Sequence, residues 1–365
     1  MASFRWWVVG AAILAIAGCA RDNPYYDANL AHHTPSGFKN NYPHRTPGTT
    51  DLWRWRFDQW RDNLPADPND PASLATVPAD PAWIRQASDD VRVTWVGHST
   101  LLVQIGRFNL LTDPQFSERA SPVSFAGPKR FQLPGVALAD LPHIDAVVIS
   151  HSHYDHLDLP TVRALALQPG GSPVFMVPLG IDLWFRDNVP AATDVRPLDW
   201  WGKTTLGDKT LTLLPVQHWG ARTLSDRNQT LWGAWSIDSA APKFRFLFGG
   251  DFGYSRDLAD IGQREAPFDL AAIPVGAYAP RWFMTPQHVN PAEAVQAARD
   301  VHARSSVAIH WGTFSLTDEP LDQPPKDLAL ARDAAGMPAD DFFVMRHGES
   351  RVWKDGKWVV RAPGS

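Results

Sequence analysis

Three histidines and an aspartate follow directly on an apolar run in the segment HIDAVVISHSHYDHLD, residues 143–158. The apolar part has the composition of a buried strand, so the polar side chains should emerge together where that strand ends. A solvated turn does not need such a cluster, whereas imidazole and carboxylate are ligands that zinc and its neighbours in the transition series accept. The segment therefore predicts a metal site at a sheet edge, with ligands His151, His153, Asp155 and His156.

The spacing of this cluster suggests that it serves more than one ion. Residues two apart in an extended segment face the same way, so His151 and His153 can converge on one metal ion. The next two candidates, Asp155 and His156, then turn back toward a second ion close by. Further ligands should also follow apolar strands, and three side chains do so: His218 after TLTLLPVQ, Asp251 after KFRFLFGG, and His310 after SSVAI.

From Val91 onward, short β-rich runs and helical patterns alternate in two similar blocks. The first block predicts strands near 91–96, 100–106, 108–114, 143–150 and 173–178, and a helix over 159–167. The second predicts strands near 210–218, 230–237, 243–251, 270–276 and 305–313, and helices over 290–303 and 326–336. A terminal strand over 342–349 and a hairpin over 351–360 with an Asp-Gly turn follow. Two packed sheets with outer helices, an α/β fold, fit this order better than one doubly wound sheet.

The first residues indicate export rather than fold. Arg5 precedes the apolar segment 6–18, which is short for a membrane span, since a span needs roughly 20 residues. Small residues lead to Cys19, the only cysteine, as in a bacterial lipobox. We expect residues 1–18 to be a lipoprotein signal peptide and Cys19 to be lipidated, which anchors the chain to a bilayer. Ala20 favours the bacterial outer membrane, with the protein facing the periplasm.

Residues 19–90 are expected to be an arm rich in Pro and Trp, and residues 91–365 the main domain. One amphipathic helix is predicted in the arm, within TTDLWRWRFDQWRDNL, where four apolar residues have near-helical spacing: Leu52, Trp53, Phe57 and Trp60. The arm could wrap the domain, cover its site or face a membrane, and the sequence leaves these alternatives open.

Charge and aromatic content narrow the partners. The formal net charge is −5 at pH 7, which argues against a nucleic-acid partner, because that would need a basic face or stripe. The chain has 17 tryptophans, which could fill a core or form an aromatic surface at a lipid interface. A phospholipid substrate and a membrane are therefore the expected partners, and the oligomeric state stays open, with a homodimer among the alternatives.

The complete motif set resembles the metallo-β-lactamase superfamily, whose HxHxDH motif is intact here over residues 151–156. Further segments are similar to the N-acylphosphatidylethanolamine-hydrolysing phospholipase D branch, among them WVGHSTLLVQ, GPKRF, QHWGART, FGGDFGYS, QHVNPAEAV and AIHWGTF. The resemblance runs from about Val91 to about Gly348 and implies an αββα sandwich, with two mixed β-sheets flanked by helices. The arm before residue 90 matches the animal members poorly, so substrate-entry features located there cannot be carried over.

The resemblance also assigns the ligands. It implies a first metal ion on His151, His153 and His218. A second ion would lie on Asp155, His156 and His310, with Asp251 bridging both. Zinc is the default cofactor for two such divalent sites, and iron or manganese suits the same ligands.

Residues near the substrate follow from the same branch. A Gln-His-x-x-Pro segment matches Gln287, His288 and Pro291, and it implies a substrate-facing His288. The HxHYDHLD form of the opening motif adds Tyr154 as a substrate contact. The catalytic groups are then expected to be Asp155, Asp251 and His288, with Gln287 and Tyr154 binding substrate. His98, in WVGHST, is expected to be a hydrogen-bonded structural residue.

The predicted reaction is hydrolysis of N-acylphosphatidylethanolamine to N-acylethanolamine and phosphatidic acid. Two cations would hold a hydroxide between them, because metal binding lowers the pKa of water to around neutrality. The first alternative is another hydrolase on this fold that acts on a lactone or a different phosphoester. The second is a lipoprotein that binds lipid without cleaving it.

Overall fold

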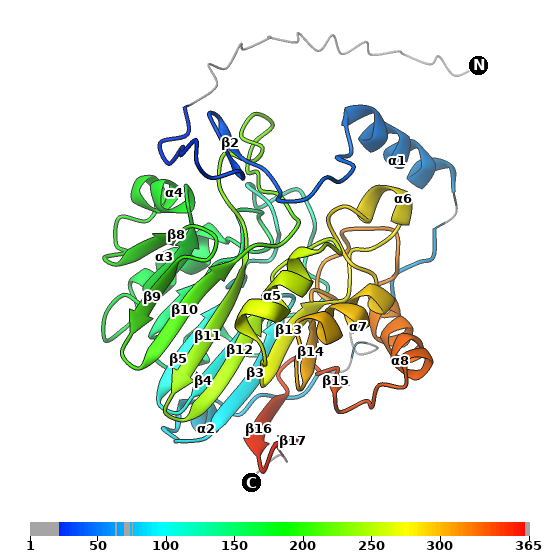
Figure 1. The fold of residues 1–365 in the computed structure, drawn as a ribbon. Coiled ribbons are helices and arrows are strands. Elements are labelled where there is room, and N and C mark those ends of the chain that lie inside the picture. Colours follow the sequence, from blue (N-terminus) through cyan, green and yellow to red (C-terminus); the bar gives the residue numbers. More distant parts are fainter. Residues whose placement is uncertain (1–21, 63, 69–73, 75, 362–365) are drawn as a thin grey trace, which may run out of the picture.

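The computed structural model describes residues 22–62, 64–68, 74 and 76–361 (Figure 1). The predicted signal peptide 1–18 and the predicted lipidation site Cys19 lie outside these residues, so both stay predictions. Within the described part of the chain, no helix combines the length and the apolarity needed to cross a bilayer.

The first sheet has eight strands in the order β17-β16-β3-β4-β5-β6-β7-β8. Strands β17 to β5 pair antiparallel, while β5 to β8 pair parallel, so the sheet is mixed. The predicted Asp-Gly turn closes the β16–β17 hairpin, with positive φ at Asp355 (50°) and Gly356 (80°), as a type I′ turn requires. The strands are β3 (Val91–Gly97), β4 (Thr100–Ile105), β5 (Phe108–Thr112), β6 (Ala146–Val148), β7 (Val174–Pro178), β8 (Val195–Leu198), β16 (Ser350–Lys354) and β17 (Lys357–Val360).

The second sheet has seven strands in the order β15-β14-β13-β12-β11-β10-β9. It is antiparallel from β9 to β12 and parallel from β12 to β15, so it is mixed as well. Since β10 and β12 both run antiparallel to β11, strands β10, β12, β13 and β14 all end at one edge. The strands are β9 (Lys203–Leu206), β10 (Lys209–Leu214), β11 (Ala234–Ala240), β12 (Lys243–Phe248), β13 (Leu270–Pro274), β14 (Ser306–Ile309) and β15 (Phe342–Phe343).

Helices cover the outer faces of both sheets, which confirms the predicted sandwich of two mixed sheets flanked by helices (Figure 1). The first sheet carries α3 (Leu159–Ala166) and α4 (Ile181–Asn188). The second carries α5 (Asp257–Glu265), α7 (Pro291–Asp300) and α8 (Gln323–Ala335). Two short helices, α2 (Pro81–Arg85) and α6 (Arg281–Met284), lie in connecting segments, and 3₁₀ turn η2 (Leu138–Asp140) precedes β6.

The core follows the two-residue period of the strands. In β3 and β4, Trp95 and Leu101 belong to the cluster that includes the second sheet, whereas Val96 and Leu102 pack in the cluster with α3 and α4. All four side chains are fully buried. Burying each of them contributes about 1.5–3 kcal/mol. The two layers together hold the carboxyl ends of the strands at fixed positions.

The arm crosses the top of the sandwich and is tied to it by polar side chains (Figure 1). A small ribbon of β1 (His33–Thr34) and β2 (Gly37–Phe38) lies there. The two rings of His32 and His33 both bond the carboxylate of Asp199, at 2.7 and 2.9 Å. The hydroxyl of Tyr25 donates to Asp182. Of the alternatives for the arm, its described part is therefore a wrapping segment.

The predicted arm helix is present as α1 (Thr49–Arg61), but its apolar stripe faces outward. Only Trp55 is buried in this helix, and its ring stacks on Phe283 of α6 at 5.0 Å. The four residues that set the helical spacing are exposed, by 39, 72, 54 and 80%: Leu52, Trp53, Phe57 and Trp60. Spacing alone could not show this, because the aromatic stripe has no partner among the described residues.

Candidate metal centre

One group of possible metal ligands joins the HxHxDH loop to the end of β10. The loop follows β6 and supplies His151 and His153, and β10 leads to His218. The Nε2 atom of His151 lies 2.8 Å from Nδ1 of His153. Nε2 of His218 is buried without a hydrogen-bond partner. This trio, called the imidazole group below, contains no carboxylate and matches the ligand set predicted for one ion.

The far nitrogen of each ring is fixed by the surrounding protein. Nδ1 of His218 donates to the carbonyl oxygen of Gln287 at 3.0 Å, and Nδ1 of His151 lies 2.9 Å from the hydroxyl of Ser150. A histidine whose Nδ1 carries the proton presents an unprotonated Nε2, which is the form that binds a metal. The backbone at 287 thus prepares His218 as a ligand.

A second group contains a carboxylate and three imidazoles, and it is called the mixed group below. Oδ2 of Asp155 lies 3.0 Å from Nε2 of His98, 3.3 Å from Nε2 of His156 and 3.4 Å from Nε2 of His310. Three of these side chains were predicted as ligands of one ion. His98 is the addition.

Asp251 lies between the two groups. Its Oδ2 atom is 3.0 Å from Nε2 of His310, 3.1 Å from Nε2 of His156 and 4.0 Å from Nε2 of His151. The loop reaches this position because Gly250 adopts φ +61°, and a Cβ there would lie 2.5 Å from Cβ of Ser150. The carboxylate therefore occupies the place expected of a shared ligand.

His288 also reaches the centre, as predicted. Its Nδ1 atom is buried without a partner and lies 3.9 Å from Oδ2 of Asp251. The ring is near those of His218 and His310, with centroids 5.5 and 5.4 Å away. Neighbouring Gln287 contributes its carbonyl oxygen to His218, and its side-chain amide lies 3.5 Å from the sulfur of Met284.

The two groups differ in protonation. Burial lowers the pKa of His153 to about 4 and holds the pKa values of His151 and His218 well below 6.5. Burial also opposes a charge on His310, but Asp251 and Asp155 outweigh it and raise its pKa to about 9. The same opposition of burial and carboxylates raises the pKa of His156 well above its ordinary value. In the metal-free protein near pH 7, the imidazole group is neutral and the mixed group holds protons.

These side chains fit divalent metal ions. Several buried atoms of the two groups have no hydrogen-bond partner: Nε2 of His156, His218 and His310, and Oδ1 of Asp251. Each buried unsatisfied polar atom costs about 1–3 kcal/mol. A bound cation would satisfy these atoms together and would displace the protons on the mixed group. The clusters can therefore hold metal, with nitrogen and oxygen donors of the type that transition metals accept.

Two residues of the centre were missed by the sequence analysis. His98 is hydrogen-bonded, as expected, but it lies inside the mixed group rather than in a purely structural position. Asp113, after β5, is fully buried, and its Oδ2 atom is 2.6 Å from Nδ1 of His156 and 2.5 Å from the hydroxyl of Ser150. An acidic residue directly after an apolar strand was a signal for Asp113, the same one that identified Asp251.

Tyr154 takes part in shaping the loop. Its hydroxyl donates to the carbonyl oxygen of Arg222 at 2.9 Å, and the Arg222 guanidinium lies 4.0 Å from its ring centroid. Arg222 in turn donates to the carbonyl oxygens of Ser152 and Leu157, both at 2.8 Å. Tyr154 and Arg222 thus brace the ligand loop, while the predicted substrate contact of Tyr154 stays a prediction.

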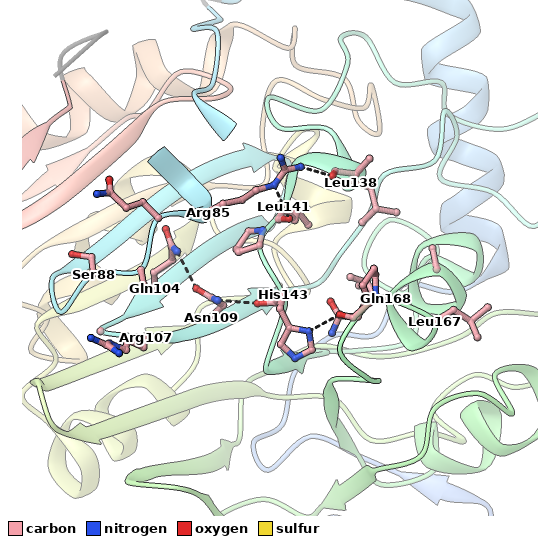
Figure 2. A pocket seen from close by; sticks show the side chains of 18 residues that line it. Arg85, Ser88, Gln104, Arg107, Asn109, Leu138, Leu141, His143, Leu167 and Gln168 are labelled. Carbon is pink, nitrogen blue, oxygen red and sulfur yellow. Dashed lines mark hydrogen bonds between the residues drawn. The ribbon is translucent and has the colours of Figure 1, made fainter. Parts of the chain in front are cut away.

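A cleft of about 900 Å³ lies elsewhere, at the opposite end of α3 and β6 (Figure 2). Its lining includes Gln104, Asn109 and His143, which form a hydrogen-bonded row with the backbone. The ligand loop precedes the first residue of α3, whereas the cleft borders the last turn of this helix, Leu165. Neither of the two ligand groups lines this cleft, so its size alone does not make it a hydrolytic site.

Comparison with known proteins agrees with this geometry. The family described as "Beta-lactamase superfamily domain" matches residues 108–311. The chain is 39% identical over 309 residues to N-acyl-phosphatidylethanolamine-hydrolyzing phospholipase D 1 of Caenorhabditis elegans, which covers 82% of this chain and 86% of the relative. It is 31% identical to the mitochondrial N-acyl-phosphatidylethanolamine-hydrolyzing phospholipase D of Saccharomyces cerevisiae, over 67% of this chain and 52% of that protein.

A solved structure shows the same fold. The chain aligns with a metallo hydrolase from the hyperthermophilic archaeon Ignicoccus hospitalis with a TM-score of 0.54 and 19% sequence identity. The alignment covers 72% of this chain and 98% of that structure.

Proposed function

We propose, from the premise that the chain belongs to the metallo-β-lactamase superfamily, that it is a phosphodiesterase of the phospholipase D type. The chain is a metal-dependent hydrolase of the metallo-β-lactamase fold. The substrate in our proposal is N-acylphosphatidylethanolamine, which would be cleaved to N-acylethanolamine and phosphatidic acid. The activity named for the Caenorhabditis elegans and Saccharomyces cerevisiae relatives supports this choice.

The observation that carries the proposal is the convergence of two ligand groups on Asp251. The imidazole group would hold one divalent ion, and Asp155, His156 and His310 would hold another, with Asp251 shared. Bound divalent ions supply Lewis acidity and lower the pKa of water, which is the chemistry that phosphodiester hydrolysis requires. Zinc suits this donor set best in our proposal, and iron or manganese suits the same ligands.

The side chains around the ligands would orient the reaction. Burial lowers the pKa of His288 to about 3, so its imidazole is neutral near pH 7. A neutral ring can hydrogen-bond a phosphoryl or leaving-group oxygen, but it is a poor proton donor. His98 bonds Oδ2 of Asp155 and would hold this carboxylate in one orientation. Asp155 stays ionised, because the charge on His156 outweighs the burial that would raise its pKa.

The membrane is the proposed partner. Lipidation at Cys19 would tether the chain to the bacterial outer membrane on its periplasmic side. The exposed aromatic face of α1, with Trp53 and Trp60, supports a lipid surface, because indole suits the interface between hydrocarbon and water. Helix α1 packs on α6, which directly precedes the loop with His288, so a bilayer at α1 would lie near the centre.

The test is an assay of the metal-loaded protein against N-acylphosphatidylethanolamine in mixed micelles, with metal content measured on the same sample. Release of N-acylethanolamine in proportion to bound metal would support the proposal. Full metal loading without release would refute the phospholipase activity. Lactones and other phosphoesters would then be assayed as substrates for the second candidate function, another hydrolase on this fold. Tight lipid binding without turnover at full metal loading would instead indicate the non-catalytic lipoprotein.

A further inference from the structure

A cavity of about 110 Å³ lies between the arm and the domain, directly beside the metal centre. The arm side includes Lys39, His44 and Arg45, and the domain side includes His218, Arg227 and Gln287. This volume corresponds to roughly four water molecules. It therefore admits one small polar group and excludes an acyl chain or an aromatic ring system.

The cavity is cationic. No carboxylate is among its lining residues. Arg45 is held by Asp51, at 2.6 Å, and by the carbonyl oxygen of Trp282. Lys39 and Arg227, by contrast, have no carboxylate partner among the described residues. Two cations without counter-ions at one small cavity favour an anionic occupant.

Arg227 is positioned by the centre itself. Its guanidinium carbon lies 3.8 Å from the ring centroid of Trp219, whose ring meets that of His153 with centroids 4.3 Å apart. One indole ring thus separates the guanidinium from a ligand of the imidazole group. Burial disfavours the charge on Arg227 and lowers its pKa, which adds to the benefit of an anion there.

Lys39 is positioned by its neighbours in the arm. Asn40 accepts a hydrogen bond from the backbone nitrogen of His218 at 3.0 Å and donates to the carbonyl oxygen of His218 at 2.8 Å. The backbone nitrogen of Phe38 donates to the carbonyl oxygen of Asn228 at 2.8 Å. The residue between them therefore has a fixed backbone beside a metal ligand, with its ammonium group at the cavity.

We propose that this cavity is a subsite for a tetrahedral phosphoryl dianion, held by Lys39 of the arm and Arg227 of the domain. The proposal rests on the proposed function and extends it to the product. In phosphodiester hydrolysis the water oxygen bonds to phosphorus, the bond from phosphorus to the ethanolamine oxygen breaks, and the leaving oxygen takes up a proton. The phosphodiester carries one negative charge, whereas the phosphomonoester product carries about −1.5 to −2 at pH 7. Two partnerless cations match that product and would bind it more tightly than the substrate.

Phosphate binding tests the subsite without relying on hydrolysis. Inorganic phosphate would be titrated calorimetrically into the metal-loaded protein, into Lys39→Gln and into Arg227→Gln. Lys243→Gln is the matched control, because Lys243 is an exposed lysine at the start of β12. We expect a phosphate site in addition to the metal centre, weakened at least about tenfold in both subsite variants and unchanged in the control. Equal phosphate affinity and stoichiometry in all four proteins would overturn the proposal. Metal content measured on each sample would separate a lost subsite from a damaged centre.

Product inhibition separates the two sources of such a dianion. If the head group of phosphatidate is the ligand, Lys39→Gln will raise the inhibition constants of both short-chain phosphatidate and inorganic phosphate. If free phosphate is the ligand, only the constant for inorganic phosphate will rise, and no rise in either would refute the subsite. Should N-acylphosphatidylethanolamine resist hydrolysis while Lys39→Gln still removes a phosphate site, the proposed phospholipase activity fails and the subsite stands.

Discussion

The imidazole group and the mixed group share Asp251 as a neighbour, but they solve the problem of burying metal ligands differently. In the imidazole group, burial keeps the rings neutral, so His151, His153 and His218 are ready for metal over most of the pH range. In the mixed group, the carboxylates hold protons on His156 and His310, which stand in for positive charge. The difference teaches that one centre can contain a site set by desolvation and another set by proton exchange.

Substituting the shared carboxylate should have the largest effect. Asp251→Asn removes the charge that both groups face, so we expect loss of metal from the mixed group and a fall in hydrolysis on the order of a thousandfold. Metal analysis and rate measurement on the same sample check this. Asp340→Asn, at an exposed aspartate, is the control. Retention of both metal and rate in Asp251→Asn would show that the two groups do not depend on Asp251.

Changing the pH should separate the groups by about a hundredfold. The pKa of His310 is raised to about 9, so below pH 9 a proton must leave before metal binds. Metal affinity of the mixed group should fall about tenfold per proton for each pH unit from 9 to 7. The imidazole group should bind evenly above about pH 5, since the pKa of His153 is about 4. Metal titrations at several pH values, with proton release recorded, measure both, and identical pH profiles would contradict the comparison.

Two substitutions behind the ligands should sharpen the contrast further. Asp113→Asn weakens the charge-assisted bond to His156, so we expect the metal affinity of the mixed group to fall about 10–100-fold. Ser150→Ala removes the bond to Nδ1 of His151 and should lower the affinity of the imidazole group by a smaller factor, since that bond is between neutral groups. Competition with a metal chelator measures each site. An equal loss from both groups in each variant would mean that the support is shared.

The smallest effect is expected in the arm. Asn40→Ala removes two hydrogen bonds to the backbone of His218, which should lower the free energy of unfolding by about 1–3 kcal/mol. Denaturant titration measures it, with Asn29→Ala as a control, because Asn29 contacts only Asp27 of its own segment. A stability unchanged from the parent protein would show that the arm does not steady the imidazole group.

Much of the centre could be predicted because its ligands follow a local rule. His218, Asp251 and His310 each come after an apolar strand, and a topology that aligns strand ends brings them together. His98 escaped because it sits in the tight turn between β3 and β4, where φ is +53° and its approach to Asp155 depends on tertiary packing.

The arm and α1 escaped prediction for a related reason. Asn40 meets His218 across 178 positions of sequence, and no local pattern marks such a contact. The aromatic stripe of α1 had the spacing of a buried face, yet Trp55 on another side of the helix is the one that packs.

The wrapped arm also has a mechanical consequence. A pull at the N-terminal end of the described chain would first load the bond from Tyr25 to Asp182, then the paired bonds from His32 and His33 to Asp199. Only after these had parted would tension reach Asn40 and, through it, His218. The contacts stand in series along the chain, so the outer ones act as a strain relief that keeps thermal jolts of a tethered end away from the metal ligand.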